Sequence, residues 1–291
     1  MIPKSFEREI IGHIGRNILA SKDRTLKMPL IECISGPPGM GKTYQTHDIL
    51  RRMGVVVCDL PGSSFENESA GVPADMIYES YVKASKYWEK GLPAAIFIDD
   101  ADAAIGQWGE LTQYTVNRQL VCSTLMALAD DPCVAYVRGE AGRGKIRTET
   151  RRVPIFMTCN DSTKMYPPLM RPGRTRTFVW NPSSDEIGDV VMGMFPYLQR
   201  EEAEELIDAM DALYEERRPR CVSGAPVSLY SDIRSTVLDD AIFDSLEGLT
   251  VREMMGLTVE PGAILNARVD VRDLIDIGDR LVTPDLGFVR V

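Results

Sequence analysis

The chain has 291 residues, of which 44% are hydrophobic and 26% are charged, and its formal net charge is −10. This length allows one large domain or two smaller domains with buried cores. The negative net charge argues against a protein whose main task is to coat nucleic acid or an anionic membrane, although it leaves room for a local basic site.

Six cysteines are scattered along the chain without a C-x-x-C pair, which is typical of small core residues in a reducing compartment. The first nine residues hold no apolar stretch of the kind found in export signals, and no segment approaches the roughly twenty apolar residues of a membrane span. We therefore expect a cytoplasmic protein without a membrane partner. Only two histidines are present, which argues against a catalytic zinc site.

Helical and strand patterns alternate in the first part of the chain. Apolar residues at helical spacing predict helices over 4–19, 43–53, 74–90 and 114–130. Short apolar runs predict five strands, over 29–35, 55–58, 94–98, 153–159 and 177–180. Strands that alternate with helices are typical of βαβ units, so we predict an α/β fold with a five-stranded, mainly parallel sheet.

Beyond about Ser183 the strand patterns fade and helical patterns dominate. The expected helices cover 184–195, 200–214, 228–246 and 270–282. Pro182 ends the last strand pattern and Ser183 is a suitable helix cap, so we place a domain boundary there. The predicted domains are an α/β domain over 1–182 and a smaller, mainly helical domain over 183–291.

A glycine-rich run follows the first predicted strand and matches G-x-x-x-x-G-K-[ST], a loop whose backbone N–H groups wrap nucleotide phosphates. Its members are Gly36, Pro37, Pro38, Gly39, Met40, Gly41, Lys42 and Thr43. Lys42 can reach the β- and γ-phosphates, and the hydroxyl of Thr43 can hold one position on Mg²⁺. A nucleotide triphosphate is therefore the expected ligand.

Polar residues follow two later strands, at the edge where open α/β sheets bind ligands. Asp99 and Asp100 end the strand at 94–98, and phosphoryl transfer uses one acid to hold Mg²⁺ and another to orient the attacking water. We assign these roles to Asp99 and Asp100 respectively. Asn160, which follows the strand at 153–159, can donate to the γ-phosphate or position water; an ordinary turn asparagine is the alternative.

Arg171 and Arg174 lie just beyond a proline-rich turn. Cations here can neutralise charge on a transferred phosphoryl group, either in the same subunit or in a neighbour. Taken alone, surface solvation is the better interpretation of either arginine.

These motifs, in this order and spacing, resemble those of AAA+ ATPases, and the stretches between them resemble the Rubisco activase family. The shared sequence segments are Gly71-Val72-Pro73-Ala74, Ile98 to Ala103, Thr112 to Gln119, Leu125 to Pro132, and Cys159-Asn160-Asp161 through Pro168 to Arg174. Thinner similarity runs from Phe6 to Val282 and includes Asp232 to Ser235.

The resemblance implies an AAA+ nucleotide-binding domain with a helical lid, assembled as a hexameric ring that binds ATP and Mg²⁺ between subunits. Lys42, Thr43, Asp99, Asp100 and Asn160 would act on the subunit's own nucleotide. Arg171 and Arg174 would be fingers that reach the neighbour's nucleotide, and Arg234 would be a lid sensor of the γ-phosphate. Loops 61–72 and 102–112 would face a central pore that grips a protein client, with Rubisco as the family's client.

The two pore segments differ from the family pattern. Residues 61–68 stand where the family has a Gly-Gly-Glu-Leu-Glu-Ser type of loop, and residues 105–110 replace a smaller glycine-rich sequence. The aromatic residues Phe65 and Trp108 in these segments are expected either to grip a peptide or to pack internally. The basic segment 138–152 is expected to be a solvated hairpin, with a collar for an acidic client or nucleic acid as the alternative.

Three functions therefore compete at the level of sequence. The first is an ATP-driven remodeller of a protein complex, either Rubisco or another client. The second is an AAA+ motor or loader on nucleic acid, which the acidic charge and the lack of an appended DNA-binding motif oppose. The third is a small-molecule kinase, a function that does not explain the sequence segments resembling activases. A GTPase is disfavoured because no Asn-Lys-x-Asp sequence follows.

Overall fold

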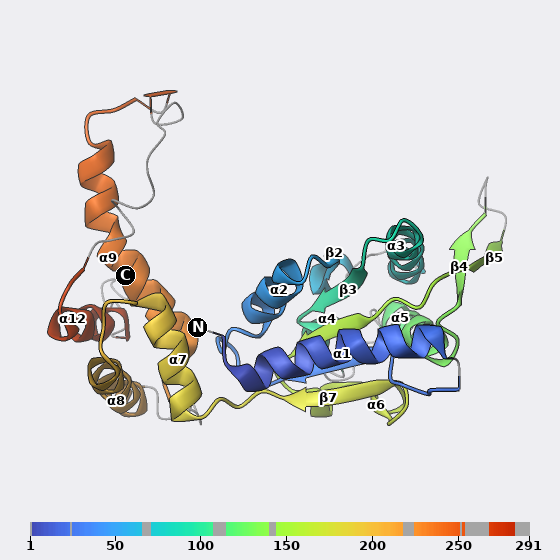
Figure 1. Cartoon of the computed structure of the whole chain (residues 1–291), viewed down its shortest axis with the longest axis horizontal. Coiled ribbons are helices and arrows are strands. Elements are labelled where there is room, and N and C mark those ends of the chain that lie inside the picture. Colours follow the sequence, from blue (N-terminus) through green and yellow to red (C-terminus); the bar gives the residue numbers. More distant parts are fainter. Residues whose placement is uncertain are drawn as a thin grey trace, which may run out of the picture. The chain divides into compact units, whose positions relative to one another are not determined.

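The structure is a computed structural model that describes residues 2–23, 25–65, 71–106, 115–139, 144–217, 224–250, 252–253 and 268–282. Its contacts divide the chain into two compact units. One unit contains residues 4–38 and 42–181, and the other contains residues 182–291 together with 1–3 and 39–41. The two units are described in turn (Figure 1).

Five parallel strands form the sheet of the first unit, which confirms the predicted α/β fold. They are β1 (Ile31–Ser35), β2 (Val56–Pro61), β3 (Ala94–Asp99), β6 (Ile155–Cys159) and β7 (Thr175–Val179), in the spatial order β2-β3-β6-β1-β7. β1, β6 and the first five residues of β3 are buried, as expected for continuous apolar runs in a sheet with both faces covered. Because all strands run in one direction, their carboxyl ends meet at one edge.

Helices cover both faces of this sheet. α3 (Val72–Glu89) and α5 (Thr115–Asp130) share a core with one set of alternate strand residues, which includes Cys33, Ile96 and Met157. α1 (Lys4–Lys22) and α2 (Lys42–Arg52) lie on the other face, where the rings of His13 and Phe156 meet at 4.8 Å. The same face holds the contact between His47 of α2 and Phe97 of β3.

Shorter elements complete this unit. They are the 3₁₀ helices η1 (Gly62–Phe65) and η4 (Ser162–Lys164), and the helices α4 (Ala101–Ile105) and α6 (Pro167–Met170). Phe65 is only 4% exposed and belongs to the core, so of the two interpretations of this residue internal packing is confirmed and peptide gripping is wrong. Its side chain belongs to the core cluster that also contains Leu60 and Ala104. Trp108 lies outside the described residues.

The basic segment contributes to an antiparallel hairpin of β4 (Val134–Arg138) and β5 (Lys145–Glu149). Most of β5 is exposed, in agreement with a solvated hairpin. The first strand begins before the predicted segment because Val134 and Ala135 are buried and anchor the hairpin.

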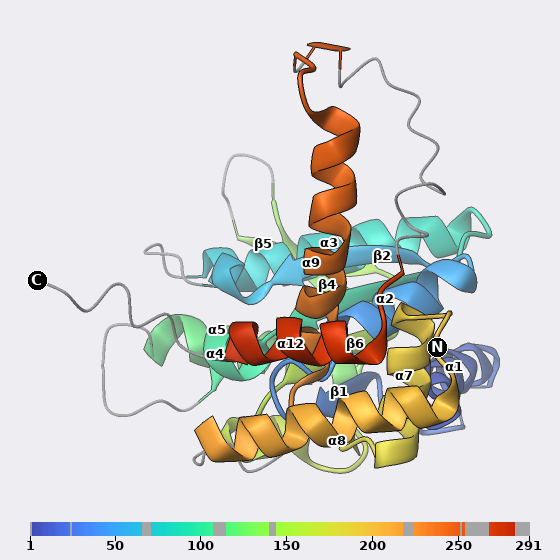
Figure 2. The same cartoon turned by 90° about the vertical axis from the view of Figure 1, so that its left-hand side faces the viewer.

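The second unit is helical. It contains α7 (Ser184–Met194), α8 (Arg200–Arg217), α9 (Val227–Leu246) and α12 (Val271–Val282). Ser183 and Glu186 form a capping box at the start of α7, which explains why the chain turns into a helix directly after Pro182. α8 and α12 lie side by side (Figure 2), and Met210, Tyr230 and Leu274 are buried in the core between the helices.

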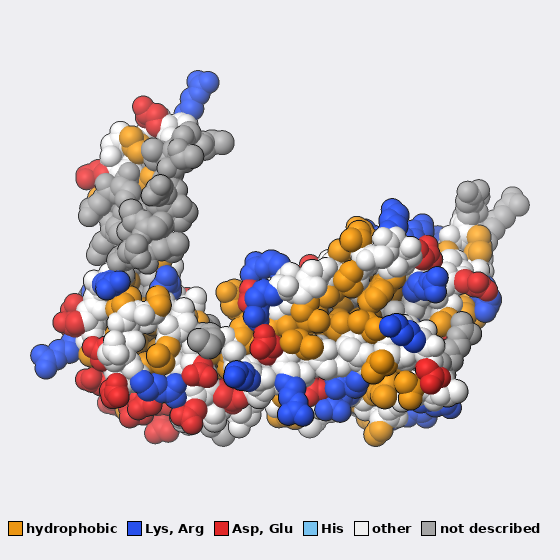
Figure 3. Space-filling view, in the orientation of Figure 1, with side chains coloured by type: hydrophobic (Ala, Val, Ile, Leu, Met, Phe, Trp, Pro, Cys, Tyr) orange, Lys and Arg blue, Asp and Glu red, His pale blue; other side chains and the backbone are white. Residues whose placement is uncertain are grey.

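Acidic side chains gather over α8 on the face shown in Figure 3. In the described parts of the chain, no helix combines the length and apolar composition that crossing a membrane would require.

Candidate nucleotide site

The glycine-rich loop connects β1 to α2 and depends on its glycines for shape. A Cβ atom on Gly36 would lie 2.1 Å from the carbonyl oxygen of Trp180, so no larger residue fits there. Gly39 and Gly41 have φ angles of 76° and 74°, in the left-handed region that favours glycine. The loop ends where α2 begins at Lys42, which places a helix N-terminus and its free N–H groups at the loop.

Lys42 ties this loop to the end of β6. Its Nζ donates to the carbonyl oxygens of Gly36 at 2.7 Å and Pro37 at 2.9 Å, and to Oδ1 of Asn160 at 2.9 Å. Burial lowers the pKa of Lys42, while nearby carboxylates act in the opposite direction. The ammonium group is therefore held at the loop, where a phosphate oxygen can take the place of these neutral acceptors.

Asp99 joins the loop to the end of β3. Its Oδ1 accepts hydrogen bonds from the hydroxyls of Thr43, at 2.8 Å, and Thr158, at 2.5 Å. Thr158 reaches it because β3 and β6 are paired, with Ile98 opposite Met157. A hydroxyl and a carboxylate thus share one point at the edge of the sheet.

Asp100 lies next to Asp99 in an uncommon backbone conformation. Its φ is 47°, the only positive φ among the described non-glycine residues, and its N–H donates to the Thr158 hydroxyl at 3.0 Å. Left-handed conformations of residues other than glycine cluster at functional sites. Burial raises the pKa of Asp100, with further contributions from Asp99 and Asp102.

Asn160 is fixed by Asp102, a residue in the first turn of α4. Oδ2 of Asp102 accepts hydrogen bonds from the backbone N–H groups of Asn160 and Asp161, both at 3.1 Å. Asp102 is 2% exposed. The carboxylate thereby orients the turn after β6 and holds the Asn160 side chain toward Lys42.

The structure therefore brings together the predicted residues Lys42, Thr43, Asp99, Asp100 and Asn160. Sequence reasoning did not include Thr158 or Asp102 among them. Two signals were available: a polar residue in the otherwise apolar strand 153–159, and an acid in the first turn of the helix after Asp99. A cation, a hydroxyl, two carboxylates and an amide at one sheet edge are the groups that phosphoryl transfer requires.

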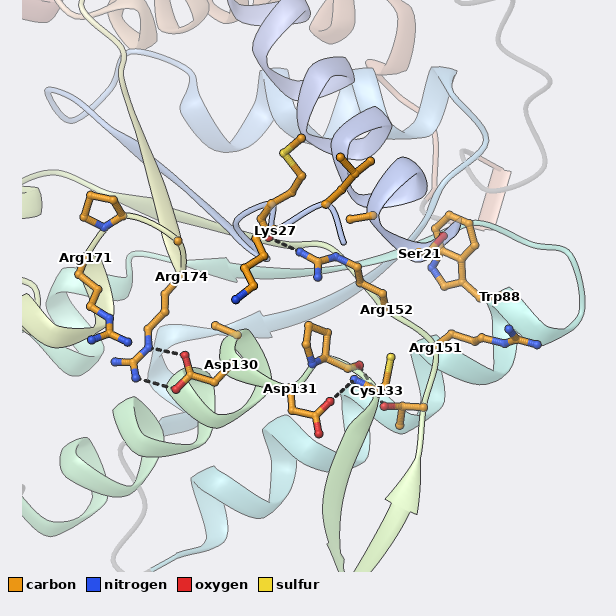
Figure 4. A pocket seen from close by; sticks show the side chains of 18 residues that line it. Ser21, Lys27, Trp88, Asp130, Asp131, Cys133, Arg151, Arg152, Arg171 and Arg174 are labelled. Atoms are coloured by element: carbon orange, nitrogen blue, oxygen red, sulfur yellow. Dashed lines mark hydrogen bonds and ion pairs between the residues drawn. The ribbon is translucent and has the colours of Figure 1, made fainter. Parts of the chain in front are cut away.

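Arg171 and Arg174 lie elsewhere in the same unit, beside a cavity of 640 Å³ (Figure 4). Lys27, Arg151 and Arg152 also line this cavity, whereas none of the seven residues named in the preceding paragraph does. Arg174 forms a bidentate ion pair with Asp130, with N···O distances of 2.7 and 2.6 Å. The two arginines are thus not part of the chain's own phosphate-loop cluster.

Arg234 belongs to α9 in the helical unit. Its Nη1 donates to the carbonyl oxygen of Met194, at the end of α7. The guanidinium is anchored within that unit.

Comparison with known proteins agrees with this geometry. The ATPase family associated with various cellular activities (AAA) matches residues 33–183, which contain the phosphate loop, both acids, Asn160 and the arginine turn. The whole chain is similar to chloroplastic ribulose bisphosphate carboxylase/oxygenase activases: it is 30% identical to activase 1 of Nicotiana tabacum, 29% to that of Zea mays and 34% to that of Chlamydomonas reinhardtii.

These relatives are longer than this chain. The alignments use 100% of this chain but cover 63%, 64% and 68% of the three relatives, in the same order. A family match over more than half of the chain, together with the nucleotide-site geometry, identifies the protein: it belongs to the AAA family of ATPases and is related to the ribulose bisphosphate carboxylase/oxygenase activases.

Proposed function

We propose that this ATPase works as a hexameric ring and hydrolyses ATP where two copies of the chain meet. One observation supports this most directly. The phosphate-loop cluster around Lys42 holds no arginine from the turn at Arg171–Arg174, and that turn lines a separate cavity. In this proposal a second copy supplies the arginine that neutralises charge on the transferred phosphoryl group.

The residues at the sheet edge fit a magnesium ion bound with the nucleotide. Mg²⁺ prefers oxygen ligands, and the Thr43 hydroxyl and Asp99 carboxylate already converge at 2.8 Å. Thr43 would hold the ion directly and Asp99 through water. The ion would supply positive charge to the phosphate oxygens.

The remaining polar groups have separate roles in this proposal. Asp100 orients the attacking water and accepts its proton, since its carboxylate has no hydrogen-bond partner in the described part of the chain. Asn160 uses Oδ1 to hold Lys42, which leaves its amide N–H groups for a phosphate oxygen. Arg234, in the proposed lid domain 183–291, senses the γ-phosphate bound by the nucleotide domain 1–182.

The client in this proposal is ribulose bisphosphate carboxylase/oxygenase. The relatives are named as its activases, and similarity to them runs through both proposed domains. Loss of the γ-phosphate removes a contact that holds neighbouring subunits, and their relative rotation would remodel the bound client. Remodelling would release inhibitory sugar phosphates from the carboxylase.

Reactivation of inhibited carboxylase tests this function. The carboxylase is first blocked with a tightly bound sugar phosphate and then incubated with the chain, ATP and Mg²⁺. We expect carboxylation to recover at a rate that depends on ATP concentration. Lys42→Ala, which removes the phosphate-binding ammonium, should give no recovery.

A blocked carboxylase that stays inactive while the chain hydrolyses ATP at its normal rate would contradict the proposed client. In that case the remodelled complex would be a different protein, and the nucleotide chemistry would stand.

A further inference from the structure

Arg171 and Arg174 are the two ends of one tight turn between α6 and β7. The N–H of Arg174 donates to the carbonyl oxygen of Arg171 at 3.2 Å, and the N–H of Thr175 donates to the same oxygen at 3.3 Å. Gly173 has a φ of 97°, which a side chain would strain. The position of one arginine therefore constrains the position of the other.

Each of the three guanidinium nitrogens of Arg174 donates a hydrogen bond within its own chain. Nε and Nη2 donate to the two carboxylate oxygens of Asp130, at the end of α5, and Nη1 donates to the carbonyl oxygen of Pro168 at 2.8 Å (Figure 4). The Arg174 side chain is 14% exposed. A bidentate pair of this geometry is among the stronger ion pairs in proteins.

Asp130 stays ionised in this arrangement. The hydrogen bonds from Arg174, more than any other group, hold the pKa of the Asp130 carboxyl below its usual range. The carboxylate thus remains a partner for Arg174 throughout the neutral pH range.

Arg171 is in the opposite situation. Its side chain is exposed and forms no hydrogen bond or ion pair with any other described residue. In Figure 4 it lies beside Arg174 on the same side of the cavity. An unpaired guanidinium next to a fixed one is free to bind an anion brought by another molecule.

We propose that Asp130 and Arg174 form a positioning clamp that fixes the turn, and that Arg171 alone contacts the phosphate bound by the neighbouring copy. This inference rests on the proposed function and narrows it, since the family resemblance gives both arginines the role of fingers. The carboxylate of Asp130 acts only through Arg174 and Arg171.

Exchanging the charges of Asp130 and Arg174 distinguishes two roles of Arg174: a clamp that positions Arg171, or a second finger that contacts the phosphate. The singles Asp130→Arg and Arg174→Asp place like charges side by side, and we expect each to lower kcat for ATP hydrolysis about 10- to 100-fold through misplacement of Arg171. The double exchange restores the ion pair and should recover kcat to within about threefold of the wild type. KM for ATP should stay unchanged, because the nucleotide is bound by the other copy's phosphate loop.

Failure of the double exchange to recover activity, in protein that melts at the wild-type temperature, would overturn the clamp. Arg174 would then contact the phosphate itself, which a carboxylate at this position cannot do.

Asp130→Asn provides a second test of the clamp, without reversing the charge of either residue. A clamp predicts a lower kcat, because the neutral amide holds Arg174 less firmly. An unchanged or higher kcat would contradict the clamp. In that case Arg174 would act as a second finger, and without the Asp130 carboxylate it would still reach the phosphate. Arg171→Ala serves as the reference: wild-type hydrolysis by this variant would refute the proposed function itself, whatever the charge exchange shows.

Discussion

At the scale of single residues, the nucleotide site is a chain of contacts from one side chain to the next. Asp102 accepts a hydrogen bond from the backbone N–H of Asn160, and the side chain of Asn160 accepts one from Lys42. Lys42 in turn donates to the carbonyl oxygen of Gly36. Each contact joins residues from different elements. Removal of any one therefore affects the placement of the others, which is why these residues should act as a unit.

Asp100→Asn should stabilise the folded protein at neutral pH while slowing hydrolysis. Burial raises the pKa of Asp100, so the ionised carboxylate destabilises the fold at a pH above that raised value, and this cost disappears as the pH falls below the ordinary value of 3.8. An amide carries no charge beside Asp99 and Asp102, and asparagine also tolerates the left-handed backbone. Because Asp100 is exposed and solvent screens its charge, we expect Tm at pH 8 to rise by no more than about 2 °C, with a smaller rise at pH 4.5.

The matched control is Asp232→Asn, at an exposed position of α9, which should leave Tm unchanged at both pH values. A lower Tm for Asp100→Asn at pH 8 would show that the Asp100 carboxylate contributes to stability, contrary to this interpretation.

At the scale of elements, α1 is fixed to the sheet by buried charges. Glu32 of β1 is fully buried, and its Oε2 lies 3.0 Å from Nη2 of Arg16 and 3.1 Å from Nδ1 of His13. Nε of Arg176 lies 3.7 Å from Oε1 of Glu32. The strand that leads into the phosphate loop is thus tied to the N-terminal helix.

Arg16→Met should destabilise the fold because it leaves Glu32 with less compensation for its buried charge. We expect a loss of about 2–4 kcal/mol in the free energy of unfolding, measured by urea denaturation. Arg8→Met, at an exposed position of the same helix, should change this free energy by less than about 0.5 kcal/mol. Equal effects of the two substitutions would mean that the buried pair does not stabilise α1 on the sheet.

The elements that the sequence predicted well are those with strong local signals. Continuous apolar runs located all five strands of the sheet, and the polar residues at their ends placed Asp99 and Asn160 at one edge. β2 continues to Pro61, beyond its predicted end at residue 58. The polar Asp59 interrupts the apolar run, as it can in this outermost strand of the sheet. Edge strands carry weaker apolar patterns than central ones.

Contacts between distant residues had no local signal. The ion pair of Arg174 with Asp130 joins residues 44 positions apart, and the hydrogen bond of Asp102 with Asn160 joins residues 58 positions apart. Phe65 is a further example, since its local sequence left peptide gripping and internal packing both open, whereas the fold buries the ring. Such pairings follow only from the packed fold.

At the scale of the whole molecule, the central claim is that hydrolysis requires two copies of the chain. Each copy carries the phosphate-loop cluster and, beside the cavity at the arginine turn, an Arg171 whose side chain has no hydrogen-bond or ion-pair partner among the described residues. In the proposed ring the γ-phosphate lies between two copies, so its loss would allow the subunits to move relative to one another.

Mixing of two inactive variants tests this claim most directly. Arg171→Ala keeps an intact phosphate loop, and Lys42→Ala keeps an intact arginine, so each alone should hydrolyse ATP at no more than about 1% of the wild-type rate. Rings assembled from equal amounts of both should recover about one quarter of that rate, because one interface in four joins an intact loop to an intact arginine. Mixed rings that remain as inactive as either variant alone would contradict the claim.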